Sequence, residues 1–457
     1  MKIKDRIKNS DIIQAILVNA LILAAFTIIM RPYLENEADI IMQELVCGDY
    51  EAGIPSSSIL FSHFLIGAIL SGLIRVMPFV PWYMVMHWIC CFSALSVIGT
   101  ISFIRSRGYT GKFLTTGVLV YLGFECYVTP GYLKTATMLS VASVYLILHM
   151  MNMESRRKLC IVLAVITGVL ASMFSFFTFV AMFIICAILS VVYLIISGAF
   201  ADKKAFIRAF VTAVVTAGAI FVVAAGLYYF DRLHYFKDPS LSASIAYRLA
   251  YEKCLSYGVP YFKFRDDEIA AARDAMKRLG ALDPDLVDTN ERLLYMAGTK
   301  LNLTIYEIRN FIQFEPENMS HLPLIYLWGF LAYIIARYGG KKGRSAVGIS
   351  SLIGIIILFM MRHYLILGYY RMYTLEIIPF IFFFMMFFGE AEYAPDIAVD
   401  EKKIKAMFAV DVAMVCYLAF FIFGDDFPVA KNTVPQTETL YIEDDSVSQE
   451  DDMPTDN

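Results

Sequence analysis

The stretch Leu159–Phe200 reads LCIVLAVITGVLASMFSFFTFVAMFIICAILSVVYLIISGAF and contains no Asp, Glu, Lys or Arg. A hydrocarbon core about 30 Å thick needs about 20 apolar residues of helix to cross it, so this run has about twice the length of one span. The stretch therefore predicts two consecutive membrane-spanning helices, divided near Phe174–Thr178.

The composition of the whole chain agrees with a membrane protein. Of its 457 residues, 59% are hydrophobic and 18% are charged. Ordinary soluble domains have roughly 45–50% apolar and about 25% charged residues. The composition therefore argues against a cytosolic enzyme. The eight cysteines form no CxxC pair, so they predict neither a disulfide framework nor a zinc site.

Apolar runs of similar length occur on both sides of this stretch. Together with its two helices they predict an all-α polytopic membrane protein with about 11 transmembrane helices. The further runs are Ile12–Met30, Trp82–Ile104, Phe113–Val128, Thr135–Met151, Ala205–Phe230, His321–Ala336, Ala346–Met361, Tyr373–Gly389 and Lys405–Gly424.

One more apolar run, Ser58–Met77, decides the topology, because counting it as a span would invert every later loop. If it does not cross, the inner loops hold 20 Lys and Arg residues and the short outer loops hold 6. This asymmetry follows the positive-inside rule. We therefore expect Ser58–Met77 to be a juxtamembrane helix that lies at or re-enters the outer face, with the N-terminus cytoplasmic and the C-terminus outside.

The formal net charge of -4 hides an uneven distribution. Asp425–Asn457 contains 10 acidic residues and 1 basic residue, so this tail carries -9 and the rest of the chain +5. We expect four parts: a transmembrane module over 1–230 with its outer loop at 31–81, an extracytoplasmic helical domain over 231–323, C-terminal transmembrane helices over 324–424 and an acidic disordered tail over 425–457. The lipid bilayer is the expected partner, and nucleic acid is not.

Three carboxylates follow the first span at alternate positions: Glu35, Glu37 and Asp39. All three face one way if the segment is extended, but only Glu35 and Asp39 do so if it is helical. A carboxylate at a water–lipid boundary is partly desolvated, which suits it to removing a proton from a hydroxyl. A solvated charge cluster at a helix end is the alternative interpretation.

The layout resembles the GT-C superfamily of glycosyltransferases, which use polyprenyl-phosphate sugars. The shared features are an acidic cluster in the first outer loop, a membrane-parallel helix, and seven spans followed by a large outer domain. Eleven spans with the C-terminus outside is similar to the protein O-mannosyltransferase branch. The stretches Glu35–Glu37, Cys47–Pro55 and Pro81–Tyr83 also resemble a group of uncharacterised bacterial membrane proteins.

The resemblance implies transfer of a sugar from a polyprenyl-phosphate donor to a cell-surface glycan, lipid or protein acceptor on the extracytoplasmic face. By position it assigns the general base to Glu37, with Asp39 and Glu35 as supporting groups. The leaving phosphate needs cations, and Arg fits phosphate with a bidentate fork. The substrate-binding candidates are Arg362, Tyr370, Arg371 and Tyr373 in one outer turn, and Lys134 in another.

Several alternatives stay open. The arginines and tyrosines of the outer turn could form only an aromatic belt, and Lys134 could pair with Glu125 as a helix-end charge pair. The histidines show no zinc motif, so no metal site is predicted from them; a divalent cation such as Mg or Mn held by the first-loop carboxylates is chemically reasonable. A flippase, exporter or non-enzymatic component of a surface-polysaccharide system is the alternative function. A bacterial plasma membrane is the expected location.

Overall fold

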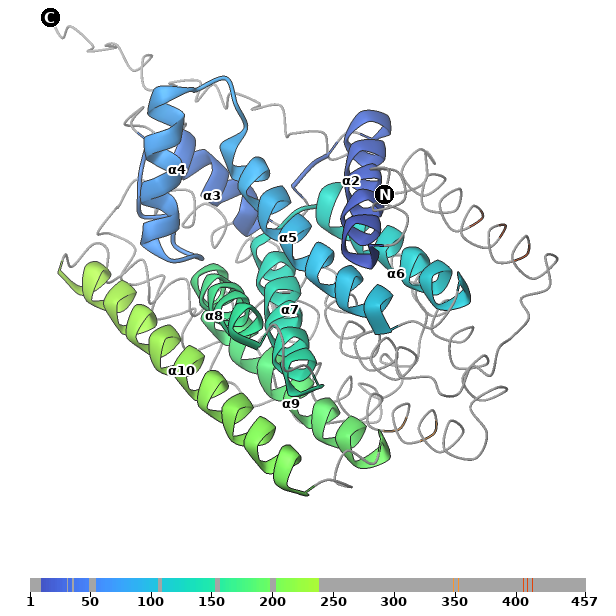
Figure 1. Ribbon diagram of the computed structural model, residues 1–457. Helices are drawn as coiled ribbons and strands as arrows, with labels where there is room; N and C mark the ends of the chain where they lie inside the picture. The colour runs from blue at the N-terminus through green and yellow to red at the C-terminus, as the bar shows by residue number, and fades with distance from the viewer. Residues whose placement is uncertain are drawn as a thin grey trace, which may run out of the picture.

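The computed structural model describes residues 10–30, 32–34, 37–48, 55–105, 109–152, 157–197 and 203–237, with isolated positions at 348, 352, 406, 409 and 413. Over the continuous ranges the regular structure is entirely helical (Figure 1). The helices are α2 (Asp11–Ile29), α3 (Glu37–Cys47), α4 (Phe64–Val76), α5 (Trp82–Arg105), α6 (Tyr109–Tyr127), α7 (Tyr132–Asn152), α8 (Arg157–Phe174), α9 (Phe176–Ser197) and α10 (Lys203–Phe236).

Five of the described helices are long and apolar enough to cross a membrane: α2, α5, α7, α8 and α10. This confirms the expected class, an all-α chain with several membrane-spanning helices. The helices α6 and α9, which the apolar runs also predict as spans, are not among the five. The spans expected after the seventh, and the domains expected over 231–323, 324–424 and 425–457, lie outside the described ranges apart from the first residues of 231–323.

The uncharged stretch divides where its length predicts. Helix α8 ends at Phe174, and α9 begins at Phe176. Between them, the Ser175 hydroxyl donates to the Thr178 hydroxyl at 2.9 Å and accepts the Thr178 N–H at 3.4 Å. A serine that binds the backbone three residues later is a common start of a helix. The predicted division near Phe174–Thr178 is thus confirmed.

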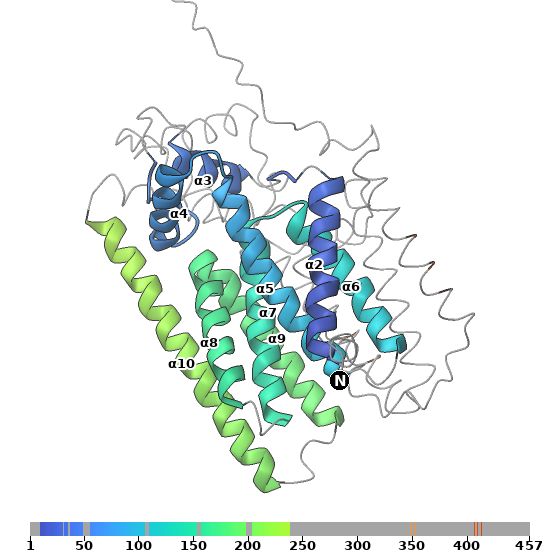
Figure 2. The same cartoon turned by 45° about the horizontal axis from the view of Figure 1, so that its top comes forward.

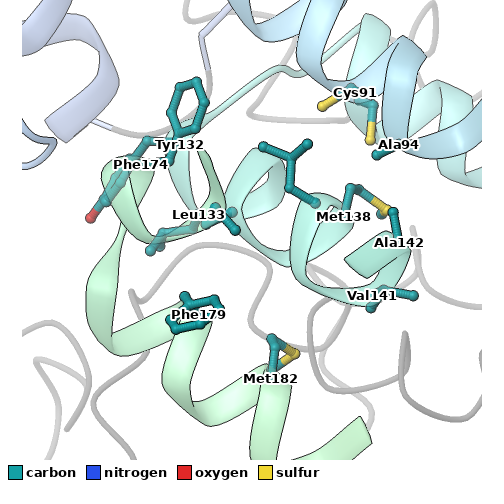
Figure 3. Close-up of a cluster of buried hydrophobic side chains, with 14 of the residues drawn as sticks. Cys91, Ala94, Tyr132, Leu133, Met138, Val141, Ala142, Phe174, Phe179 and Met182 are labelled. Atoms are coloured by element: carbon teal, nitrogen blue, oxygen red, sulfur yellow. The ribbon is translucent and has the colours of Figure 1, made fainter. Parts of the chain in front are cut away.

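Helix α7 forms the centre of the described bundle. Its apolar stretch is buried throughout, and it packs against α5, α8, α9 and α10. Figure 3 shows residues of α5, α7, α8 and α9 meeting in one apolar cluster, among them Cys91, Met138 and Phe179. Small residues let these helices approach closely: a Cβ on Gly168 of α8 would lie 2.7 Å from Ile220 of α10. Close packing of this kind is the main attraction between helices in lipid.

Helices α3 and α4 lie together at one end of the bundle, while the longer helices run away from that end (Figures 1 and 2). Helix α4 has 13 residues, which gives it a length of about 20 Å at 1.5 Å per residue, less than a hydrocarbon core of about 30 Å. The segment before it is held at the same end, since the His63 N–H donates to the Met173 carbonyl near the end of α8 at 2.9 Å. The helix is thus shorter than the hydrocarbon core is thick. Of the expected helix Ser58–Met77, only Phe64–Val76 is helical.

Helix α10 continues past the expected end of the first module at residue 230. It runs to Phe236, and its last two turns bind the segment before α4 (Figure 2). The Asp231 carboxylate accepts the Phe64 N–H at 2.9 Å, and the Tyr235 hydroxyl accepts the Leu60 N–H at 3.2 Å. Leu60 has a φ of 62°, a conformation that costs free energy for a residue other than glycine. The helix thus extends past residue 230, the expected end of the transmembrane module, and the division at that residue stays a prediction.

Candidate functional site

The acidic segment of the first loop becomes a helix at Glu37, the first residue of α3. The extended alternative, in which all three carboxylates face one way, is therefore excluded from this residue onward. Glu35 lies outside the described residues, and of Glu37 the structure describes the backbone alone. Asp39 is the one carboxylate of the three whose side-chain contacts the structure describes.

Asp39 is 1% exposed and joins α3 to two other helices. Its Oδ1 accepts the Tyr83 hydroxyl of α5 at 2.6 Å and the backbone N–H of Tyr132, the first residue of α7, at 2.9 Å. The first N–H groups of a helix lack partners within the helix and carry a partial positive charge, so a carboxylate binds there favourably. Asp39 therefore fixes α3 on the start of α7.

Gly131 makes room for this arrangement. A Cβ at Gly131 would lie 2.8 Å from Oδ2 of Asp39, a separation that real side chains essentially never show. The turn before α7 thus needs a residue without a side chain, because the carboxylate occupies that space. The sequence TPGY at 129–132 provides it.

Lys134 lies in the first turn of α7, and its ammonium group donates three hydrogen bonds within the protein. Its Nζ donates to Oε2 of Glu125 at 2.9 Å, and to the carbonyl and the hydroxyl of Thr129 at 3.0 Å and 2.7 Å. An ammonium group has three N–H donors, and three acceptors surround this one. Lys134 therefore closes the turn between α6 and α7. This is the charge pair with Glu125 that the sequence offered as the alternative to substrate binding.

Sequence reasoning missed His87 on α5, one helical turn beyond Tyr83. Its ring is fully buried, and Nδ1 lies 2.7 Å from the Thr135 hydroxyl of α7. The other nitrogen, Nε2, is buried and has no hydrogen-bond partner among the residues that the structure describes. Tyr83 and His87 lie four residues apart, a spacing that places both on one face of a helix, but only the fold brings this face against α7.

The other expected site residues are not among those the structure describes. They are Arg362, Tyr370, Arg371 and Tyr373. Within the described part of the chain, no group of three His, Cys, Asp or Glu side chains could hold a metal ion. The side chains of Glu35 and Glu37 fall outside that part, so the expected divalent cation stays a prediction.

The described polar groups gather at one end of α7. A carboxylate and a phenol meet at its first residue, an ion pair closes the turn before it, and a histidine lies one turn further along. Such a cluster can orient a neighbouring carboxylate and share protons among oxygen and nitrogen atoms. Comparison with protein-family models, curated proteins and solved structures finds no match for the chain.

Proposed function

We propose that the chain is a membrane glycosyltransferase that moves a sugar from a polyprenyl-phosphate donor to a glycan, lipid or protein acceptor on the extracytoplasmic face. One observation carries the proposal: Asp39 fixes α3 to the ends of α5 and α7. The acidic segment is therefore attached to the end of the bundle at a defined point. A general base needs such a fixed position.

The proposed reaction uses Glu37 as the base. Its carboxylate takes the proton of the acceptor hydroxyl while the hydroxyl oxygen attacks the anomeric carbon of the donor sugar. The bond between that carbon and the phosphate oxygen breaks, and polyprenyl phosphate leaves. Arg362 and Arg371 balance the charge of the leaving phosphate, and Tyr370 and Tyr373 contact the sugar.

The supporting residues have different parts in this scheme. Asp39 acts as a positioning residue, because both of its described hydrogen bonds hold helices together. Glu35 precedes α3 and supports Glu37. We assign Lys134 to the turn between α6 and α7 and not to the phosphate site, since its three donors bind Glu125 and Thr129. It stabilises the turn that ends at the residue bound by Asp39.

The distribution of polar groups along α7 favours an enzyme over a transporter. A transporter binds its substrate near the membrane midplane, often where helices are broken. The hydroxyl groups further along α7 instead have partners within the protein. Thr137 and Ser140 donate to carbonyl groups of their own helix, at 2.8 Å and 2.7 Å, and Ser143 donates to the Ala164 carbonyl of α8 at 2.8 Å. The charged groups of the cluster lie at the helix end. A flippase, exporter or scaffold of a surface-polysaccharide system remains the second candidate.

The test is sugar transfer by the purified full-length protein in proteoliposomes, with a panel of radiolabelled polyprenyl-phosphate sugars. Glu37→Gln should abolish transfer, because the amide has no basic oxygen. Glu44→Gln, on the same helix, is the matched control and should retain transfer. Undiminished transfer by Glu37→Gln would exclude this base. A wild-type protein that transfers none of the sugars, yet moves a lipid-linked sugar between leaflets, would favour the flippase.

A further inference from the structure

The last turns of α10 hold an arginine in a fixed orientation. Nε and Nη2 of Arg232 both donate to the hydroxyl of Tyr228, at 3.0 Å and 2.6 Å. The guanidinium carbon lies 5.2 Å from the centre of the same ring. Two of the five N–H donors of the guanidinium thus fix its plane, and no hydrogen bond to a described residue uses the other three.

Tyr228 is itself held by the start of α9. Its ring stacks on Phe176 with centroids 4.4 Å apart and an angle of 19°, and it meets Phe177 edge to face at 5.9 Å. These phenylalanines are the first two residues of α9. The Tyr228 ring thus connects Arg232 to the start of α9, and this contact helps to fix the orientation of the guanidinium.

Within the described residues no carboxylate forms an ion pair with Arg232. Its sequence neighbour Asp231 is directed to α4 instead, where its Oδ1 accepts the Phe64 N–H at 2.9 Å and lies 3.8 Å from Nδ1 of His63. A half-buried guanidinium that keeps free donors and lacks a counter-charge favours binding of an anion from outside the chain.

The surface around Arg232 indicates which anion this is. Tyr229, Leu233 and Phe236 share a helix face with Arg232 and are 65%, 42% and 57% exposed. The apolar stretch of α10 has 31 residues, a length of about 47 Å against a hydrocarbon core of about 30 Å, so its end reaches the headgroup region. Exposed apolar side chains next to a cation suit the boundary between lipid tails and headgroups.

We propose that Arg232 binds the phosphate group of a membrane lipid whose chain lies along the exposed apolar face of α10. The lipid phosphate accepts the free N–H groups of the guanidinium, and its tail contacts Tyr229, Leu233 and Phe236. This proposal does not depend on the proposed sugar transfer.

Native mass spectrometry of the full-length protein in detergent tests the site, with dioleoyl phosphatidic acid as the probe. Dioleoylglycerol, which has the same tails without phosphate, should bind far more weakly. Arg232→Gln should lower the affinity for phosphatidic acid about tenfold, because it removes charge-assisted hydrogen bonds. Tyr228→Phe keeps the stacked ring but frees the guanidinium, so it should cause a smaller loss.

Arg208→Gln is the matched control, since Arg208 is an exposed arginine near the opposite end of α10. It should bind phosphatidic acid as the wild type does. Equal losses in Arg232→Gln and Arg208→Gln would show general attraction at helix ends and overturn the proposal. Equal binding of the two lipids would also overturn it.

A second variant serves if Arg232→Gln does not fold. Arg232→Lys keeps the positive charge but lacks the two-pronged guanidinium, so it should still bind phosphatidic acid less tightly than the wild type. Wild-type affinity in both Arg232→Lys and Tyr228→Phe would contradict the site.

Discussion

Asp39 and Lys134 are both charged and buried, and both lie beside the start of α7, yet they bind different kinds of partner. Asp39 uses a backbone N–H and a neutral hydroxyl, whereas Lys134 is neutralised by Glu125. A buried charge without a partner costs several kcal/mol, roughly 3–5 kcal/mol when one member of a buried pair is removed. Both residues therefore contribute to stability at the site, and each predicts a mutational outcome.

Breaking the Lys134–Glu125 pair from either side should destabilise the protein. Lys134→Met leaves the Glu125 carboxylate buried without its counter-charge, and Glu125→Gln does the same to the ammonium group. Each single variant should lose about 3–5 kcal/mol, while the double variant should lose less than the sum of the two. Thermal unfolding in detergent gives the comparison. Additive losses would mean that the pair does not couple.

The Asp39 contact can be disturbed from both helices. Asp39→Ala removes the acceptor of the Tyr132 N–H and the Tyr83 hydroxyl, at a cost of about 1–3 kcal/mol for each donor left unpaired. Gly131→Ala places a methyl group where the carboxylate lies and should lower the unfolding temperature in the same direction. Because both act on one contact, the double variant should be little worse than Asp39→Ala. A fully additive double variant would contradict the contact.

At the scale of helices, polar side chains connect elements that apolar packing alone would leave free to slide. Asn19 in the middle of α2 is fully buried. Its amide donates to the Phe92 carbonyl at 3.0 Å and the Ser96 hydroxyl at 2.9 Å, and it accepts the Tyr127 hydroxyl at 2.7 Å. One side chain thus fixes the position of α2 against α5 and α6.

Asn19→Leu should weaken the attachment of α2 by about 1–2 kcal/mol, since interhelical hydrogen bonds in membrane proteins contribute about 0.6 kcal/mol on average and up to about 1.7 kcal/mol. The control is Thr27→Val, because the Thr27 hydroxyl binds carbonyl groups of its own helix. It should change the unfolding temperature by much less. Equal effects would show that the loss in Asn19→Leu comes from polarity and not from the connection between helices.

For the whole molecule, the described bundle has two ends, and α4 does not cross between them. Figure 2 shows α3 and α4 at one end of the bundle and the start of α8 at the other. Cys47 is the last residue of α3, Phe79 lies between α4 and α5, and Leu159 is in the first turn of α8. Phe79 and Leu159 are 81% and 55% exposed. The same arrangement places the proposed base and the proposed lipid site at the end that carries α3 and α4.

Single-cysteine labelling in intact cells tests this arrangement. In a cysteine-free background, Cys47 restored alone and Phe79→Cys should both react with a membrane-impermeant maleimide, because the positive-inside rule places their end outside. Leu159→Cys should react only after the cells are permeabilised. Labelling of Cys47 and Phe79→Cys from opposite sides would mean that Phe64–Val76 crosses the membrane.

Local pattern was sufficient for much of the helical framework. Uncharged runs of span length predict α2, α5, α7 and the pair α8–α9, because backbone polar groups in lipid must be satisfied within a helix. The break between α8 and α9 at Ser175 also follows from the length of the uncharged stretch, which is about twice that of one span. The end of α10 does not follow, since its hydrogen bonds with Leu60 and Phe64 join residues more than 160 positions apart.

The sequence by itself determined the class of the protein, a chain of apolar helices long enough to span a membrane, and the presence of an acidic segment after the first of them. These depend on composition and length, which are local. Only the tertiary structure decided the partners of Asp39 and His87. Asp39 meets Tyr83 and Tyr132 from 44 and 93 positions away, and these contacts exist because helix packing brings three separate helix ends together. Such pairings depend on how the helices rotate and tilt against each other, which no local pattern specifies.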